Sequence, residues 1–311
     1  MATINDVAKE SGLSVGTVSR YLNGAQLKQL NNDSIEAAIE KLGYRSNGLA
    51  RSMKTGRSMM VAIIVPSISN MFSMRVIESI ERVLEEQDYS VLVSDCRDSI
   101  ENEYRKISLM CSKMVDGFVI MPTSLDTARI QQIVGNTPVV LIDRTMDKPV
   151  FDSVTIDNRG ASYRLVKRAL EDGIKKIGII EGPQSLLTAR ERAAGYDQAL
   201  KEFGIESKYR NQVGYSVESG YNAISNWINE GLEAVFASNY ELTVGAMNAL
   251  YDNKKKMRVI GFDSLELAYF TNQTYDYISQ PIEEIGMQAA KLLLERIKNP
   301  DREIVNIVLQ L

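Results

Sequence analysis

The chain of 311 residues contains no histidine and only two cysteines, Cys96 and Cys111. The lack of histidine excludes the catalytic triads, metal sites and general bases that depend on an imidazole. The two cysteines form no CxxC pair, so neither a disulfide framework nor a thiolate metal cluster is indicated. This composition fits a reducing compartment, and we expect a cytoplasmic protein.

Long apolar runs and nucleotide-binding loops are missing as well. No stretch approaches 18 uninterrupted apolar residues, and the N-terminus has no charged start followed by an apolar run. We therefore expect neither a membrane span nor a signal peptide. The sequence contains no Walker A loop and no GxGxxG. Carboxylate catalysis stays open, but no pattern predicts an enzyme, a cofactor or a bound metal.

Charge is distributed unevenly along the chain. Residues 1–58 hold eight Lys or Arg against five Asp or Glu, a net +3, which leaves −7 for the rest of a chain whose net charge is −4. A basic head on an acidic body lets one region meet phosphate while the remainder is repelled from it. The excess is small, so the argument for nucleic acid depends on the local pattern.

Residues 3–23, TINDVAKESGLSVGTVSRYLN, predict two short helices. Thr3 and Asp6 have the spacing of a capping box, Gly12 breaks the first helix, and Ser14 caps the second. The second helix has an apolar stripe on one side, and its other face carries Gly16, Thr17, Ser19 and Arg20. Two short helices joined by a tight turn, the second with a polar outer face, are typical of a helix-turn-helix DNA reader.

A third helix is predicted after this pair, with Asp33 and Glu36 near its start and Gly43 at its end. Three short helices can close a small apolar core. The spacing alone leaves two interpretations open, a DNA-binding head or a three-helix cap with no DNA role.

From about Met59 the pattern changes to apolar runs that alternate with amphipathic helices. We expect strands at 60–66, 90–94, 117–121, 139–142, 153–156, 177–180, 234–238 and 259–262. We expect helices at 74–87, 102–115, 160–171, 189–203, 218–230, 241–252 and 282–298. Such alternation predicts parallel sheets covered on both faces. Eight units fit two similar α/β lobes better than one sheet.

Several segments together resemble one known family. Residues 2–24, ATINDVAKESGLSVGTVSRYLNG, and 39–58, IEKLGYRSNGLARSMKTGRS, are similar to the start of lac-repressor-type (LacI/GalR) transcription regulators. The similarity continues through DRTMD, SVTIDNRGA, ARERAAGYDQAL, FASNYELTVGAM, VIGFDS and IGMQAAKLLLERI. The resemblance implies an N-terminal all-α helix-turn-helix head plus hinge, followed by an α/β two-lobe periplasmic-binding-protein-like core with parallel sheets and a ligand between the lobes.

On this resemblance we expect four regions. They are a DNA-binding head at 1–45, a hinge helix or linker at 46–58, an N-terminal core lobe at 59–157 and 280–297, and a C-terminal core lobe at 158–279 and 298–311. The crossovers between lobes are expected near Asp157, Ser279 and Lys298.

The hinge is the segment that orders on operator DNA in the family and inserts a side chain into the minor groove. Met53 matches that wedge position. Ser46 and Gly48 stand where the family commonly has proline and alanine, so we expect a hinge that is mostly disordered without DNA. A simple basic linker is the alternative.

The resemblance also implies which residues contact DNA. Val15, Gly16 and Arg20 match positions that face bases, and Arg20 either donates to guanine or holds a phosphate. Thr17 and Ser19 are expected to contact backbone phosphate. The full expected set is Thr3, Ser14, Val15, Gly16, Thr17, Ser19, Arg20, Asn23, Tyr44, Asn47, Ala50 and Met53.

Ligands of open α/β sheets bind outside the carboxyl ends of the strands. The effector residues expected there are Phe72, Ser73, Asp143, Arg192, Tyr215, Asn239, Tyr240 and Asp263. The resemblance assigns effector contact to Arg192 and ring stacking to Tyr215. Carboxylates, amides and aromatic faces suit a polyhydroxylated ligand. For each residue the alternative is a strand-end cap or a surface ion pair.

One position departs from the family pattern. Asn239 is followed by Tyr240 where relatives usually have Asp, so a common acceptor for vicinal hydroxyls is lost. With Arg192 and Arg144 nearby, and Arg190 as a further candidate, a sugar acid or sugar phosphate joins a neutral sugar as a candidate effector. For Arg190 the alternative, a solvated helix residue, is the stronger one.

These observations predict a homodimeric transcription regulator, a repressor of a carbohydrate-use operon that binds a two-fold symmetric DNA site and a small effector. The alternative is a solute-binding protein of the same two-lobe fold. The absent signal peptide and the basic head of 58 residues argue against it. An enzyme is a third and weaker reading.

Overall fold

The computed structural model describes residues 2–22, 25–44, 56–123, 126–145, 149–263 and 274–311. The chain divides into two compact units, Met1–Ser58 and Met59–Leu311. Each unit has an apolar core of its own. None of the described helices has the length and apolar character that crossing a membrane requires.

The first unit, the head, consists of α1 (Ile4–Ser11), α2 (Val15–Leu22) and α3 (Gln29–Leu42). The capping box of Thr3 and Asp6 is present at the start of α1. The three helices close over a small core of Val7, Ala8, Val18, Ile35 and Ala38. Helix α3 begins at Gln29, before Asp33. The sequence pattern does not reveal this start, because the first turn carries an exposed Leu30 and has no side-chain cap.

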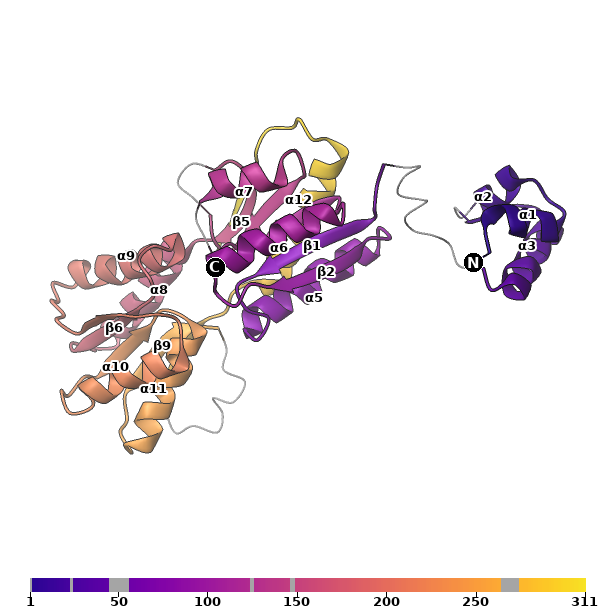
Figure 1. Cartoon of the computed structure of the whole chain (residues 1–311). Helices are drawn as coiled ribbons and strands as arrows, with labels where there is room; N and C mark the ends of the chain where they lie inside the picture. Colours follow the sequence, from indigo (N-terminus) through magenta and orange to yellow (C-terminus); the bar gives the residue numbers. More distant parts are fainter. Residues whose placement is uncertain (1, 23–24, 45–55, 124–125, 146–148, 264–273) are drawn as a thin grey trace. The chain divides into compact units, whose positions relative to one another are not determined.

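The second unit contains two parallel sheets (Figure 1). The first has the order β11-β5-β4-β3-β1-β2 and the second β10-β9-β8-β6-β7. Apart from β11, the two orders correspond strand for strand, so β4 and β9 are equivalent, as are β3 and β8. The predicted fold class is confirmed.

The N-terminal lobe is built from β1 (Met60–Val65), α5 (Met71–Glu85), β2 (Ser90–Asp95), α6 (Ile100–Ser112), β3 (Gly117–Ile120), α7 (Thr127–Val134), β4 (Val139–Ile142) and β5 (Asp152–Ile156). The C-terminal lobe is built from α8 (Asn158–Glu171), β6 (Ile177–Glu181), α9 (Leu187–Glu202), β7 (Arg210–Gln212), α10 (Val217–Trp227), β8 (Ala234–Ala237), α11 (Tyr240–Asp252), β9 (Arg258–Phe262) and β10 (Tyr275–Ile278). The chain then returns to the first lobe in α12 (Ile282–Lys298) and β11 (Asn306–Leu309).

Helices cover both faces of each sheet. In the first lobe, α5 and α12 pack together on one face, and α6 and α7 on the other. In the second lobe, α8 and α9 form one layer and α10 and α11 the other. The central strands are buried along their whole length, as in β3 and β8. Because these strands expose no face to water, their sequences are continuous apolar runs.

The expected assignment of 298–311 to the C-terminal lobe needs correction. Strand β11 pairs in parallel with β5, at the edge of the N-terminal sheet, and α12 lies against the same sheet. No crossover therefore occurs near Lys298. Strands β7, β10 and β11 and helix α7 were not predicted. The three strands lie at sheet edges, are short and have mixed polarity, so their sequences lack the apolar run of a buried strand.

Asp152 attaches the final segment to the sheet. Its carboxylate is fully buried and accepts from Arg296 Nε and Nη2 at 2.9 and 2.8 Å. It also accepts from the backbone N–H of Val305 at 2.8 Å, just before β11. Arg302 adds a second ion pair at 3.3 Å. One buried carboxylate thus joins β5, the end of α12 and the approach to β11.

Asp152→Ala should destabilise the second unit by about 3–5 kcal/mol, because it leaves a largely buried guanidinium without its partner. Chemical denaturation should show this as a lower midpoint. Glu295→Ala is the matched control, since Glu295 also pairs with Arg302 but is 63% exposed. We expect its effect to stay within about 0.5 kcal/mol. Equal losses in both variants would contradict the assigned role of Asp152.

Candidate functional site

Helix α2 presents a face that the head does not use for its own packing. Val18 is fully buried, whereas Val15, Gly16 and Arg20 are exposed. Ser14 Oγ caps the helix by accepting from Thr17 N at 3.2 Å. The side chain of Arg20 makes no hydrogen bond or ion pair within the described part of the chain. An exposed cation and an exposed apolar side chain on one helix suit a groove with phosphates and base edges.

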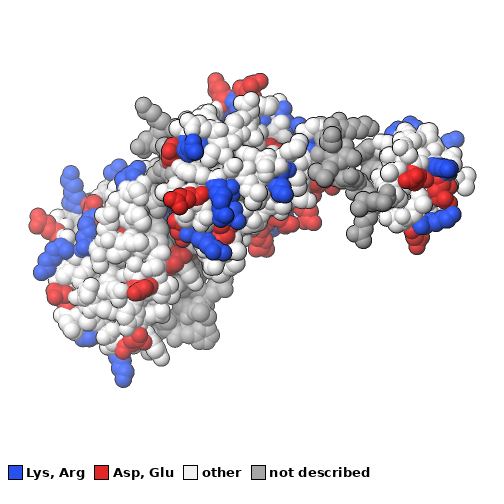
Figure 2. All heavy atoms as spheres, in the orientation of Figure 1, with Lys and Arg blue, Asp and Glu red and all other residues white. Residues whose placement is uncertain are grey.

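Two acidic side chains of the head already have partners within it. Tyr21 donates to Glu36 Oε1 at 2.6 Å, and Lys41 pairs with Glu10 at 2.6 Å. Figure 2 shows positive and negative side chains interspersed over the visible face of the head. The described residues on the visible face of the head therefore form no continuous basic patch.

The other residues predicted to contact DNA differ in exposure, and some lie outside the described residues. The hydroxyl of Thr3 donates to Asp6 at 2.8 Å, and Tyr44 is half-buried against the head core. Ser19 and Thr17 are half-buried on α2. Asn23, Asn47, Ala50 and Met53 lie outside the described residues, as does most of the expected hinge.

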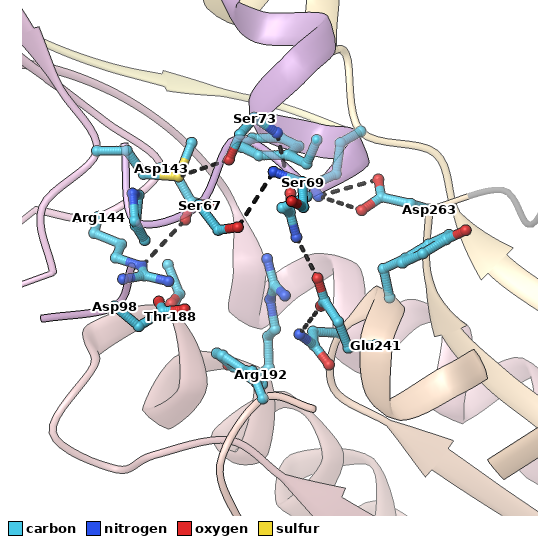
Figure 3. Close-up of a pocket in the computed structure, with 18 residues that line it drawn as sticks. Ser67, Ser69, Ser73, Asp98, Asp143, Arg144, Thr188, Arg192, Glu241 and Asp263 are labelled. Atoms are coloured by element: carbon cyan, nitrogen blue, oxygen red, sulfur yellow. Dashed lines mark hydrogen bonds and ion pairs between the residues drawn. The ribbon is translucent and has the colours of Figure 1, made fainter. Parts of the chain in front are cut away.

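The second unit contains a cavity of about 330 Å³ between its lobes, at the carboxyl ends of the strands (Figure 3). All eight residues predicted for the effector line it. The sequence pattern missed further lining residues, among them Asn70, Asp98, Thr188, Glu241 and Gln280. The volume lies at the lower end of the range for small-molecule sites.

Asp143 and Asp263 occupy equivalent positions in the two lobes. Asp143 follows β4 and Asp263 follows β9, and both backbones are left-handed, with φ of 62° and 66°. Aspartate tolerates this conformation better than most residues, so the chain can turn sharply where each strand ends. The shared geometry brings one carboxylate from each lobe to the cavity.

Arg192 on α9 is buried and rigidly held. Its Nε donates to Asn158 Oδ1 and its Nη1 to Ser238 O, both at 2.8 Å. The guanidinium carbon lies 3.7 Å from the centroid of the Phe262 ring. Arg192 points into the cavity (Figure 3), and its Nη2 has no hydrogen-bond partner within the described ranges. These donors are left for a ligand.

The close approach of α9 to α8 depends on Gly195. A Cβ there would lie 2.3 Å from the carbonyl oxygen of Arg159. Because glycine has no such atom, α9 can lie directly on α8. There Asn158 Oδ1 accepts the hydrogen bond from Arg192 Nε.

Three buried polar atoms near the cavity have no hydrogen-bond partner within the described part of the chain. They are Tyr215 OH, Gln280 Oε1 and Ser238 Oγ. Tyr215 and Gln280 line the cavity, and Ser238 directly precedes Asn239. Burial raises the pKa of Tyr215, which keeps its hydroxyl neutral. Since buried polar groups are normally paired, Tyr215 OH and Gln280 Oε1, which line the cavity, indicate a ligand that supplies hydrogen bonds. The Ser238 hydroxyl lies outside the lining and close enough to Tyr215 to oppose the rise of its pKa.

Tyr240 lacks the carboxylate that relatives usually have after Asn239, and the residue after Tyr240 replaces that acceptor. Glu241, in the first turn of α11, lines the cavity and supplies a carboxylate. Arg190, considered as a ligand contact, does not line the cavity. It is exposed and donates to the carbonyls of Gln184 and Ser185. Arg144 does line it, and pairs with Asp143 at 3.5 Å.

Acidic groups therefore outnumber basic ones around the cavity. Four carboxylates line it, from Asp98, Asp143, Glu241 and Asp263, against the guanidinium groups of Arg144 and Arg192. Burial raises the pKa of Asp263 to about 6, although Arg192 and the Gln280 amide oppose the shift. At neutral pH this balance disfavours a ligand with strong negative charge.

Two family models match the chain. One described as "Bacterial regulatory proteins, lacI family" matches residues 3–47. The other, "Periplasmic binding proteins and sugar binding domain of LacI family", matches residues 58–310. Together they cover the head and nearly all of the second unit.

Curated relatives are similar over almost the whole chain. The HTH-type transcriptional regulator RegA of Clostridium saccharobutylicum is 33% identical over 100% of this chain and 97% of its own length. The HTH-type transcriptional repressor CytR of Escherichia coli (strain K12) is 30% identical over 96% of this chain and 90% of its own length. These relatives are transcription regulators and not enzymes.

Solved structures share the fold. The lac repressor dimer bound to operator and the anti-inducer ONPF matches with a TM-score of 0.88 and 23% identity, over 99% of this chain and 96% of that chain. The complex of transcriptional regulator CelR with cellobiose matches with a TM-score of 0.74 and 26% identity, over 100% and 97%.

Asp263→Asn should stabilise the protein more at pH 8 than at pH 5. The raised pKa means that the folded state holds the proton more tightly than the unfolded chain does, relative to an ordinary value of 3.8. The carboxyl therefore favours folding fully below about pH 4, and this contribution is lost as the pH rises through 6. The neutral amide avoids that loss, by at most about 3 kcal/mol. Denaturant unfolding at both pH values measures it, and an equal difference at both would contradict the assignment.

Proposed function

Because the chain belongs to the LacI family of bacterial regulatory proteins, we propose that it is a homodimeric transcription repressor controlled by a small effector. One observation carries the proposal. The same chain carries a head with an exposed face of α2 and a cavity with buried polar atoms that have no partner in the described residues. The first suits a DNA groove and the second a small molecule. We expect the protein to act in the cytoplasm, where bacterial DNA lies.

The head would bind DNA through the exposed residues of α2. Each chain offers one recognition helix, so a dimer would bind a two-fold symmetric site. Arg20 is the candidate for bidentate recognition of guanine, and Val15 offers an apolar contact for a thymine methyl group. The other DNA contacts, including Met53 as a minor-groove wedge, remain predictions.

The cavity would bind a neutral, hydroxyl-rich effector such as a sugar. Its carboxylates and the free Oε1 of Gln280 are acceptors, whereas Arg192 Nη2 and Tyr215 OH are donors. Hydroxyl groups serve both needs, because each is donor and acceptor. Phe72, Tyr215 and Tyr240 offer rings for the apolar faces of such a ligand. The excess of carboxylates makes a sugar acid or sugar phosphate the weaker candidate. A relative of the same fold, CelR, is named in complex with cellobiose, which supports the carbohydrate class.

The alternative is a solute-binding protein, for which the head would have no role. Sequence-selective DNA binding distinguishes the two functions, since only the regulator should select a DNA sequence.

For the regulator, an operon of carbohydrate use is the expected target.

Arg20→Ala should lower affinity for a DNA site selected from random sequence by about 1–3 kcal/mol, if Arg20 donates to a guanine edge. Affinity for unselected DNA should change much less. Lys28→Ala is the control, since this exposed cation precedes α3 and should affect both DNAs alike. Titration of the wild type and both variants at fixed salt, on each DNA, measures the affinities. Equal losses on both DNAs in the Arg20 variant would reduce it to a phosphate contact, and a wild type without sequence preference would contradict the regulator.

Arg192→Ala should weaken effector binding about tenfold or more, because a charged hydrogen bond contributes about 1.5–3 kcal/mol. Thermal shifts with neutral sugars, sugar acids and sugar phosphates identify the effector, since a ligand at 100 times its Kd stabilises by about 2.7 kcal/mol. Arg190→Ala is the matched control on the same helix, outside the cavity. Effector-free operator binding should be unchanged in both. Loss of that binding in Arg192→Ala would instead make Arg192 structural.

A further inference from the structure

Glu241 joins the two lobes across the cavity. Its Oε1 accepts a hydrogen bond from Nδ2 of Asn70, which caps α5 in the N-terminal lobe. Its Oε2 accepts from Nδ2 of Asn239, which caps α11 in its own lobe. Figure 3 shows two dashed bonds at the carboxylate of Glu241, among the residues that line the cavity. A single carboxylate thus connects the N-termini of one helix from each lobe.

Each asparagine is fixed at its other end. Asn70 Oδ1 accepts from Ser73 N at 3.0 Å, and Asn239 Oδ1 accepts from Leu242 N at 2.9 Å. Neither amide can rotate away from Glu241 without uncapping its helix, which is unfavourable. The helix N-termini also favour a negative charge between them. The link is therefore directional and preorganised on both sides.

We propose that Glu241 is a positioning residue that sets the separation of the lobes around the effector cavity. Arg192 and Asp263 come from one lobe, and Asp143 and Phe72 from the other. They face a common cavity only at a suitable separation. The Asn70–Glu241 bond can exist only when the lobes are close, so it favours the closed arrangement. This role rests on the proposed assignment of the cavity to an effector.

The decisive variant is Asn70→Asp. Aspartate caps a helix as well as asparagine does, so α5 keeps its bond to Ser73. The donor to Glu241 is replaced by a second carboxylate, and like charges repel. Spin labels on cysteines introduced at the exposed positions Glu85 and Tyr251, at the far ends of α5 and α11, report the lobe separation. We expect a population at longer distance that the wild type lacks.

Asn239→Asp is the matched control. It places the same new charge against Glu241 and keeps the cap on Leu242, but it lies in the same lobe as Glu241. The label distance should stay at the wild-type value. A shift as large as that of Asn70→Asp would mean that charge near Glu241, and not the link between lobes, controls the distance, and the proposal would fail.

A reversed pair tests the bond itself. In Asn70→Asp with Glu241→Gln, the glutamine amide can donate to the new carboxylate, so the wild-type distance should return. Failure to return would overturn the proposal, as would an unchanged distance in Asn70→Asp. If Asn70→Asp does not fold, Asn70→Ser serves, because serine caps a helix but is too short to reach Glu241. These measurements use neither DNA nor effector, so a negative result would leave the operator and effector experiments to decide the proposed function separately.

Discussion

Parallel strands buried on both faces are the constraint on which the rest of this structure depends. Such strands have no room for polar side chains along their length, as the fully buried β3, β4 and β8 show. Polar chemistry is therefore displaced to the positions where strands end. Because both sheets use the same strand order, each lobe delivers an equivalent set of strand ends to the cavity. Asp143 and Asp263 follow directly from this equivalence.

The buried charge of Arg192 shows how the cavity is prepared for a ligand. The guanidinium is held by an amide oxygen, a carbonyl oxygen and an aromatic face, and it forms no ion pair with any residue that the structure describes. Asp263 consequently stays only partly compensated, and burial raises its pKa. The unpartnered oxygens of Tyr215 and Gln280 add to the same cost. A ligand that pairs these groups recovers part of their desolvation free energy, so binding and stability are coupled.

The sequence pattern predicted the buried strands and the polar residues that directly follow them. Each of the eight expected strands is present, because a buried parallel strand is an uninterrupted apolar run. The polar residues directly after those runs, such as Asp143 and Asp263, line the cavity as expected. The edge strands β7, β10 and β11 escaped detection because they are short and of mixed polarity, and β7 reads only Arg-Asn-Gln. The edge strand β2 was detected because it keeps an apolar run. The position of β11 could not be read from its own sequence, since its partner β5 lies about 150 residues earlier and is reached through the buried Asp152.

Glu241 and Asn70 were missed for a different physical reason. Both stand at helix N-termini, where Asn is expected as a cap and Glu as a first-turn residue. That local role fully explains their residue types, so the sequence contains no separate sign of a contact between lobes. An asparagine cap, however, uses only the carbonyl oxygen and leaves the amide NH₂ free to bind elsewhere. At the cavity, the same side chain can therefore stabilise a helix and recognise a partner. Cap positions that face a cleft should be tested with aspartate, which keeps the first role and removes the second.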